Sequence, residues 1–237
     1  MNPWVRAFAL DWLVIIAAFT AAFIWLPLWL AVPSSALVIG SRQHALAILA
    51  HDAAHGHAPK SMRALSFWII GIDISAYRDF HFAHHRLLGS PLDPELQLHK
   101  FHWDNFSWRC VAKDLLGFSA RETLKIWRLA GGSYPILLNV LCAIAIVETA
   151  VKIVLVTGFD VRPSVVPWAV VVWLLAINTS FMACFRQRAI IEHGYAYRIR
   201  YLHKLVLFPH NCWYHEKHHK DPAIPFWSLS RGESMVS

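Results

Sequence analysis

Long apolar runs alternate along the chain with two long polar segments. Four of these runs approach the roughly 20 apolar residues that an α-helix needs to cross a bilayer. They occupy about 8–28, 29–50, 135–156 and 165–185. Arg42, Gln43 and His44 interrupt the second run, which is therefore the least continuous of the four. The pattern predicts an all-α membrane protein with four transmembrane helices.

Composition and charge agree with a membrane location. The chain is 57% hydrophobic and 16% charged, and its mean hydropathy of +0.40 is too high for an ordinary soluble domain. The segments 57–133 and 186–237 carry net charges of +3 and +4, which together account for the formal net charge of +7 of the whole chain. The positive-inside rule places both segments and both termini in the cytoplasm. We therefore predict a single domain, 1–237, with a cytoplasmic helical cap built from 57–133 and 186–237.

Other classes of protein are disfavoured by the same features. The basic balance is explained by membrane topology, and no basic arm with interleaved aromatic residues indicates nucleic acid as a partner. The four cysteines, Cys110, Cys142, Cys184 and Cys212, are scattered without a CxxC pair. They predict neither a disulfide framework nor a zinc ribbon.

Three histidine clusters lie in or beside the polar segments: HDAAH at 51–55, HFAHH at 81–85 and HEKHH at 215–219. Residues at i, i+3 and i+4 share one face of a helix, so each cluster presents two or three imidazoles in one direction. Imidazole suits zinc, copper, iron and nickel, so the spacing alone does not identify the metal. Eight ligands are too many for one ion, which favours a two-metal centre. The predicted ligands are His51, His55, His81, His84, His85, His215, His218 and His219.

The order of the clusters and of the apolar runs resembles the membrane fatty-acid desaturase and hydroxylase superfamily over essentially the whole chain. The resemblance rests on the segments RQHALAILAHDAAHG, YRDFHFAHHRLLGSPLDPE and PHNCWYHEKHHKDPAIPFWSL. A single HxxxH would be weak evidence, but three such boxes in order with the expected intervening spans are specific. The third segment also resembles bacterial carotene ketolases.

The resemblance implies a non-heme di-iron centre that activates dioxygen. It implies a further ligand between the last span and the third box, which matches His193 in RAIIEHG. Several animal acyl desaturases have Asn four residues before this histidine, where this chain has Ala189. Glu192 is an alternative source of a carboxylate, so the coordination of one iron departs from that pattern. The resemblance assigns His51 to one iron and His55 to the other, and the division of the remaining ligands stays open.

Carboxylates and amides near the boxes are candidates to orient the histidines, because metal-bound imidazoles usually donate their other N–H to such groups. The candidates are Asp52, Asp79, Asp93, Glu95, Glu192, Asn211 and Glu216. His44 lies on the same helical face as His51 but deeper, and is predicted to be a packed or substrate-lining residue, with a role as a further metal ligand as the alternative.

The resemblance implies oxidation of an unactivated C–H bond in a long apolar substrate, foremost the desaturation or hydroxylation of a fatty acyl chain. A carotenoid ketolase or hydroxylase is the alternative. A histidine-rich metal transporter is a remote alternative, because transporter sites usually lie near the bilayer midplane whereas these clusters are expected at one edge of the membrane. The sequence has neither a His-Pro-Gly-Gly heme signature nor a Rossmann-like glycine motif. We therefore expect an external electron donor, such as a ferredoxin, a rubredoxin or a cytochrome b5-like protein with its reductase. The expected location is a bacterial inner membrane.

Overall fold

A computed structural model of the chain describes residues 1–68, 70–88, 90–95, 108–156, 168–194 and 201–230, apart from the side chains of 146–156, 190, 193–194 and 201–203. Every regular element in these residues is a helix, and one isolated bridge pairs Ile72 with Gly132. The prediction of an all-α fold is confirmed.

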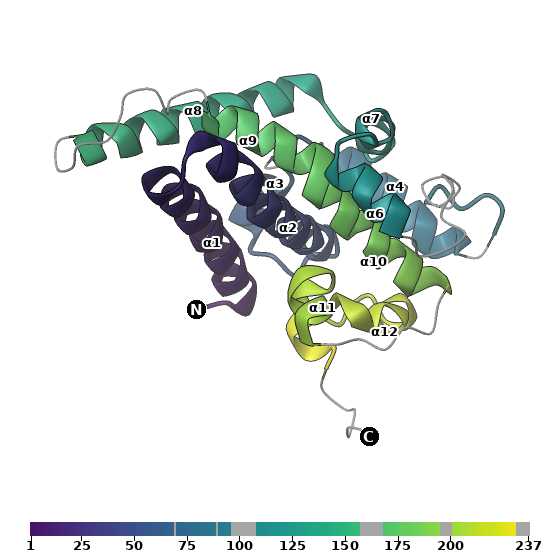
Figure 1. Cartoon of the computed structure of the whole chain (residues 1–237). Helices are drawn as coiled ribbons and strands as arrows, with labels where there is room; N and C mark the ends of the chain where they lie inside the picture. The colour runs from purple at the N-terminus through teal and green to yellow at the C-terminus, as the bar shows by residue number, and fades with distance from the viewer. Residues whose placement is uncertain (69, 89, 96–107, 157–167, 195–200, 231–237) are drawn as a thin grey trace.

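The elements follow one another as Figure 1 shows. The N-terminal half contains α1 (Pro3–Trp25), α2 (Leu28–Ala54), α3 (Lys60–Trp68), α4 (Ile74–Leu87) and α6 (Trp108–Leu115). The rest contains α7 (Ala120–Leu129), α8 (Tyr134–Val156), α9 (Trp168–Ala176), the π-helix η2 (Ile177–Phe181), α10 (Met182–Gly194), α11 (Tyr201–Val206), the 3-10 helix η3 (Pro209–Tyr214), α12 (His215–Lys220) and the 3-10 helix η4 (Phe226–Ser228).

Helix α2 lies in the middle of the molecule and packs against α1, α3, α9 and η2 (Figure 1). The polar residues that interrupt its apolar run form links to these neighbours. Arg42 Nη1 lies 3.2 Å from Asp11 Oδ1 on α1, and Gln43 Nε2 donates to the Trp173 carbonyl on α9 at 3.1 Å. The interruption in the hydrophobic pattern therefore belongs to a helix that is surrounded by protein along much of its length.

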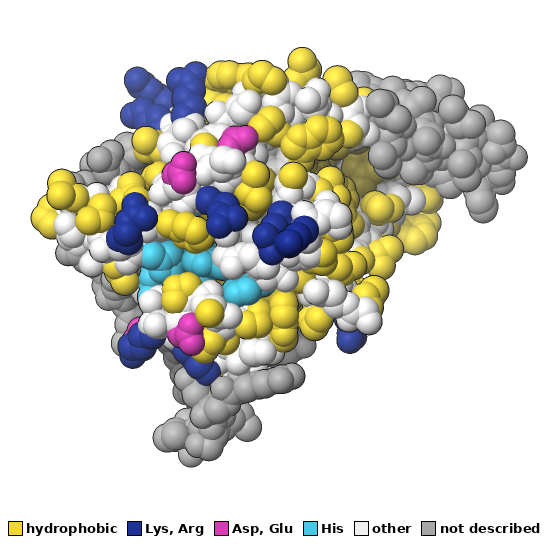
Figure 2. Space-filling model, turned by 180° about the vertical axis from the view of Figure 1, so that it is seen from behind, with side chains coloured by type: hydrophobic (Ala, Val, Ile, Leu, Met, Phe, Trp, Pro, Cys, Tyr) yellow, Lys and Arg dark blue, Asp and Glu magenta, His cyan; other side chains and the backbone are white. Residues whose placement is uncertain are grey.

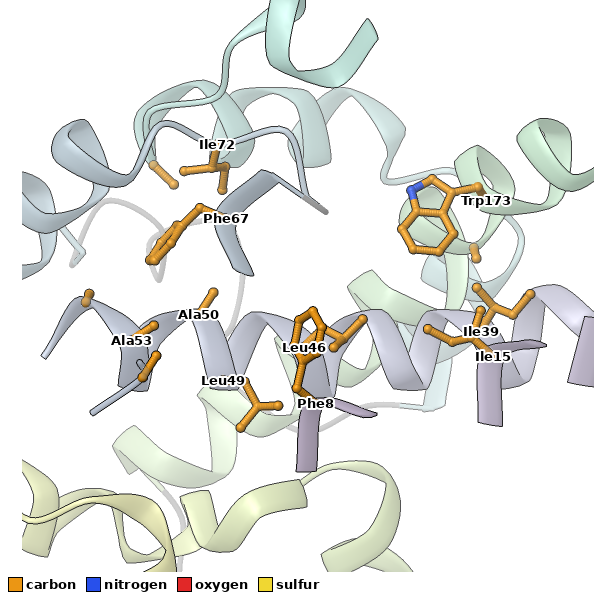
Figure 3. Packing of buried hydrophobic residues seen from close by; sticks show 14 of the residues in the cluster. Phe8, Ile15, Ile39, Leu46, Leu49, Ala50, Ala53, Phe67, Ile72 and Trp173 are labelled. Carbon is orange, nitrogen blue, oxygen red and sulfur yellow. The ribbon is translucent and has the colours of Figure 1, made fainter. Parts of the chain in front are cut away.

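The hydrophobic core is built along the same helix. Figure 3 shows Phe8 of α1, Leu46 of α2, Phe67 of α3 and Trp173 of α9 among its residues, and each of the four is at most 8% exposed. Burial of apolar side chains of this size is the dominant favourable contribution to folding. The core therefore fixes α2, whose C-terminal end carries the first histidine cluster.

A close crossing holds α2 against η2. A Cβ atom at Gly40 would overlap the Ser180 hydroxyl of η2, so only glycine permits this approach. The Ser180 hydroxyl donates to the Ala36 carbonyl at 2.6 Å. Single π-helical turns frequently occur at functional sites, and this one carries Ile177 and Phe181 into the wall of a cavity of about 160 Å³.

Two of the four predicted spans coincide with helices that are long and apolar enough to cross a membrane, judged by length and composition. These helices cover Pro3–Trp25 and Trp168–Ala189. The second predicted span corresponds to α2, and the third to α8, of which Tyr134–Ala145 forms a shorter apolar helix among the described residues. Four transmembrane helices, the cytoplasmic cap and the single domain stay predictions.

The C-terminal elements are tied to the first two helices. His210 of η3 lies 2.8 Å from Asp11 Oδ2 of α1 through its Nε2, and Arg42 Nη2 donates to the Leu205 carbonyl at 2.6 Å. His210 and Asn211 both adopt left-handed backbone conformations, with φ of 55° and 57°. The Asn211 amide donates to the Phe226 carbonyl at 3.1 Å. These contacts position α12, which carries the third histidine cluster.

Candidate metal centre

The three histidine clusters lie on different helices that meet at one place. HDAAH forms the last turn and the C-cap of α2, HFAHH lies in the last turns of α4, and HEKHH forms most of α12. Because every cluster is helical, the i, i+4 members of each point the same way, as the spacing predicts. The structure brings all eight clustered histidines together.

The eight histidines form two groups. In each group one ring nitrogen from every member lies within 4.8 Å of the corresponding atoms of the others. The larger group, called here the five-histidine group, is His51, His55, His81, His85 and His218. His51 and His55, which the resemblance assigns to different irons, therefore lie in the same group. The smaller, called the three-histidine group, is His84, His215 and His219.

Contacts between ring nitrogens indicate that both groups fit a metal ion. His81 Nε2 lies 3.0 Å from both His55 Nε2 and His85 Nε2, and His219 Nε2 lies 2.8 Å from His215 Nε2. The Nε2 atoms of His51 and His218 are buried and make no hydrogen bond. Burying a ring nitrogen without a hydrogen-bond partner raises the free energy of the folded state, unless a cation binds to it. A metal ion bound to these nitrogens would satisfy them together.

Carboxylate side chains contact the Nδ1 atoms of two histidines in the second cluster, HFAHH. Asp93 oxygens lie 2.8 and 3.0 Å from His84 Nδ1, and Glu95 Oε1 lies 2.9 Å from His81 Nδ1. A carboxylate on Nδ1 keeps the proton there and leaves Nε2 as the metal-binding atom. Asp93 and Glu95 therefore lie where the sequence predicts orienting groups.

Replacing Asp93 with Asn should weaken metal binding at the three-histidine group. The substitution removes the carboxylate that fixes the His84 ring, and losses of such partners typically reduce metal affinity by about 10–100-fold. The measurement is a titration of the metal-free protein with Fe²⁺ or Zn²⁺. Asp73→Asn is the matched control, since the Asp73 side chain is exposed and accepts a hydrogen bond from the Ala76 amide, away from the histidines. Equal affinities of Asp93→Asn and the unaltered protein would contradict the assignment.

Burial keeps several of these imidazoles neutral. It is the main reason that the pKa is lowered to about 2 for His55, about 4 for His85 and about 3 for His218. Repulsion from neighbouring imidazoles is the second cause, from His81 on His55 and His85 and from His85 on His218. Neutral imidazole is the form that binds metals. The site therefore presents its ligands in the competent form at neutral pH.

The other predicted orienting residues have different partners. Asp52 Oδ1 lies 2.7 Å from His57 Nδ1 and accepts a hydrogen bond from the Phe226 amide. Asn211 bonds the backbone, as described above, and Glu216 bonds Lys220 at 2.6 Å. None of these contacts reaches a histidine of the three clusters, so a direct orienting role for Asp52, Asn211 and Glu216 stays a prediction.

His193 lies in the last turn of α10, but its side chain falls outside the described residues, so its predicted role as a ligand stays a prediction. Its neighbour Glu192 is 2% exposed and pairs with Arg188. Burial raises the pKa of Glu192 to about 7, against the opposing effect of the Arg188 guanidinium. Sequence reasoning missed Arg188, although an arginine four residues before Glu192 at the end of an apolar run was a visible signal.

A cavity of about 160 Å³ lies directly against the histidines. His51, His81, His215 and His218 form part of its wall, and most of the remaining wall is apolar. The apolar lining includes Phe67, Ile72, Phe80, Ile126, Trp127, Ile177, Phe181, Met182, Phe185 and Phe226. His44 also lines it, as predicted from its helical face. An apolar substrate in this cavity would lie beside the candidate metal ligands.

Comparisons with known proteins agree with this geometry. The family model described as fatty acid desaturase matches residues 25–236, which include all three histidine clusters. A protein of Bradyrhizobium elkanii named dihydrorhizobitoxine desaturase is 25% identical over 260 residues, covering 93% of this chain and 72% of that protein. The match to the family model extends over most of the sequence, and the chain therefore belongs to the fatty acid desaturase family.

Proposed function

We propose that the protein is a membrane-bound, non-heme di-iron oxidoreductase that uses dioxygen to oxidise an unactivated C–H bond. The observation that carries this proposal is the convergence of eight histidines from three helices into two adjacent groups. Imidazole ligands suit iron as well as other transition metals, and family membership favours iron among them. The reaction is desaturation or hydroxylation, and the name of the Bradyrhizobium relative supports the former.

In this proposal the five-histidine group holds one iron and the three-histidine group, with His193 as a further ligand, holds the other. When bound, the two irons supply the activation of dioxygen that breaks the C–H bond. The chain's own residues position the reaction. Asp93 and Glu95 fix the rings of His84 and His81, Tyr77 stacks on His81 with ring centroids 5.5 Å apart, and the apolar cavity wall excludes water.

The substrate is proposed to be an acyl lipid whose reacting segment enters the cavity. An engineered apolar cavity of about 150 Å³ binds benzene, so a cavity of about 160 Å³ holds a short segment of a chain and not its whole length. We propose that the substrate enters from the membrane, that the four predicted spans cross a bacterial inner membrane, and that both termini lie in the cytoplasm. An external redox protein supplies the electrons.

Lipid and carotenoid extracts from cells expressing the chain should decide the reaction, with cells expressing His85→Ala as the matched control. New double bonds or hydroxyl groups in acyl chains, absent from the control, are expected. Keto-carotenoids with unchanged acyl chains would instead support the carotenoid ketolase that the third histidine box resembles. Products present at equal levels in both cultures would contradict catalysis by the histidine centre.

A further inference from the structure

One wall of the cavity is charged, although most of its lining is apolar. Arg188 and Glu192 of α10 both line the cavity that His51, His81, His215 and His218 border. Their side chains are 19% and 2% exposed. Long charged side chains are rarely buried unless they are paired and fully hydrogen-bonded. Their presence beside the reacting position therefore calls for a partner.

The two side chains do not satisfy each other. Arg188 Nε lies 3.5 Å from Glu192 Oε2, and neither Arg188 Nε nor Glu192 Oε1 makes a hydrogen bond. The pair also has the less favourable helical orientation, with the cation four residues before the anion. A buried ion pair with incomplete hydrogen bonding contributes little to stability and often destabilises the fold. A purely structural role therefore explains the pair poorly.

A ligand that has both a hydrogen-bond donor and an acceptor would satisfy the unpaired atoms of both side chains. Arg188 Nε–H needs an acceptor and Glu192 Oε1 needs a donor, and with Glu192 ionised the pair as a whole carries no net charge. A hydroxyl or an amide provides both functions without adding a charge. A carboxylate or an ammonium group would satisfy one partner and repel the other, and a plain hydrocarbon would leave both unsatisfied.

We propose that Arg188 and Glu192 bind an uncharged hydrogen-bonding group of the substrate, a hydroxyl or an amide, close to the carbon that is oxidised. The inference rests on the proposed function and narrows its substrate class. Since the cavity holds roughly six to ten non-hydrogen atoms, by comparison with a benzene-sized cavity, the polar group lies within that distance of the reacting carbon. The substrate is thus oxidised near its polar end and not in the middle of a long saturated chain.

The test compares four nine-carbon probes: nonane, 1-nonanol, nonanoate and nonylammonium. Their binding to the full-length, metal-loaded protein in lipid nanodiscs is measured by equilibrium dialysis and corrected with empty nanodiscs. The unaltered protein should bind 1-nonanol at least about tenfold more tightly than the other three, since about 1.4 kcal/mol corresponds to tenfold. Equal binding of 1-nonanol and nonane would overturn the proposal.

Single substitutions should switch the preference in opposite directions. Glu192→Gln removes the carboxylate that lies 3.5 Å from Arg188, so nonanoate should become the tightest probe. Arg188→Gln leaves the Glu192 charge unopposed, so nonylammonium should become the tightest. Arg128→Gln is the matched control, because Arg128 is exposed on α7 beside the cavity-lining Trp127, and it should keep the original order. An unchanged order in both cavity variants would overturn the proposal.

A double substitution keeps the test decisive if a single variant fails to fold. Arg188→Met with Glu192→Met replaces both charges by apolar groups of similar length, a change that is often neutral or stabilising for buried pairs. This variant should bind nonane at least as tightly as 1-nonanol, and a retained preference for the alcohol would contradict the proposal. Iron content and dioxygen consumption, measured on the same preparations, test the proposed function separately from the order of probe binding.

Discussion

His219→Ala is expected to reduce the iron content from about two to about one per chain and to abolish activity. His219 belongs to the three-histidine group, which would keep only His84 and His215 among its described members. His85→Ala should also abolish activity but retain more metal, because four members of the five-histidine group remain. The measurement is iron per chain by elemental analysis, together with dioxygen consumption and product formation.

Membrane insertion should be unchanged in both variants, because the affected helices, α4 and α12, lie outside the membrane-length helices Pro3–Trp25 and Trp168–Ala189. His203→Ala is the matched control, since this histidine lies outside the three clusters. It should retain the iron content and the activity of the unaltered protein. Full activity in His219→Ala or His85→Ala would refute the assignment of the metal centre.

Turnover in detergent should require an added redox protein, and NAD(P)H alone should support none. Figure 2 shows histidine side chains reaching the surface on one face, with lysine and arginine side chains around them. Arg86 beside His85 and Lys220 beside His219 are both exposed. An acidic donor docked on this face would be steered by charges that are screened over about 8 Å at physiological ionic strength. The rate at limiting donor should therefore fall as salt rises.

Charge reversal should locate the docking face. Arg86→Glu combined with Lys220→Glu should raise the KM for an acidic ferredoxin or rubredoxin about tenfold, equivalent to roughly 1.4 kcal/mol, and leave kcat nearly unchanged. Arg128→Glu, which changes the same kind of charge on the exposed side of α7, should have a much smaller effect. Turnover by the purified chain with NAD(P)H and no partner would refute the requirement for a donor.

The histidine clusters could be predicted from the sequence because their spacing is a local property of a helix. The division into groups could not. Within box two, His81 and His85 are one turn apart and stay together, whereas His84 joins the other group. Within box three, His215 and His219 stay together and His218 separates. Pairs at i, i+4 lie about 40° apart around a helix and the third member lies 60–100° away, but only the packing of α2, α4 and α12 decides which group each meets.

The same contrast between local and distant effects applies to the fold. Apolar runs predicted the helices, yet they gave no indication that Arg42 and Gln43 bond to α1 and α9. Asp93 lies close to box two in sequence and its contact with His84 was predictable. The position of Arg188 and Glu192 in the cavity wall could not be predicted, because the other walls come from helices that are distant in the chain.

The bond between Asp11 and His210 joins residues 199 positions apart, and this separation bears on how the centre matures. A ribosome releases His51, His55, His81 and His85 long before His215, His218 and His219. Four members of one group are therefore available on the nascent chain, while the other group has only His84. Because a metal site is rarely preformed in an unfolded chain, ion binding contributes directly to folding, and we expect the five-histidine group of the proposed centre to acquire its ion during synthesis. The three-histidine group must wait until the finished C-terminal segment docks on the first helix.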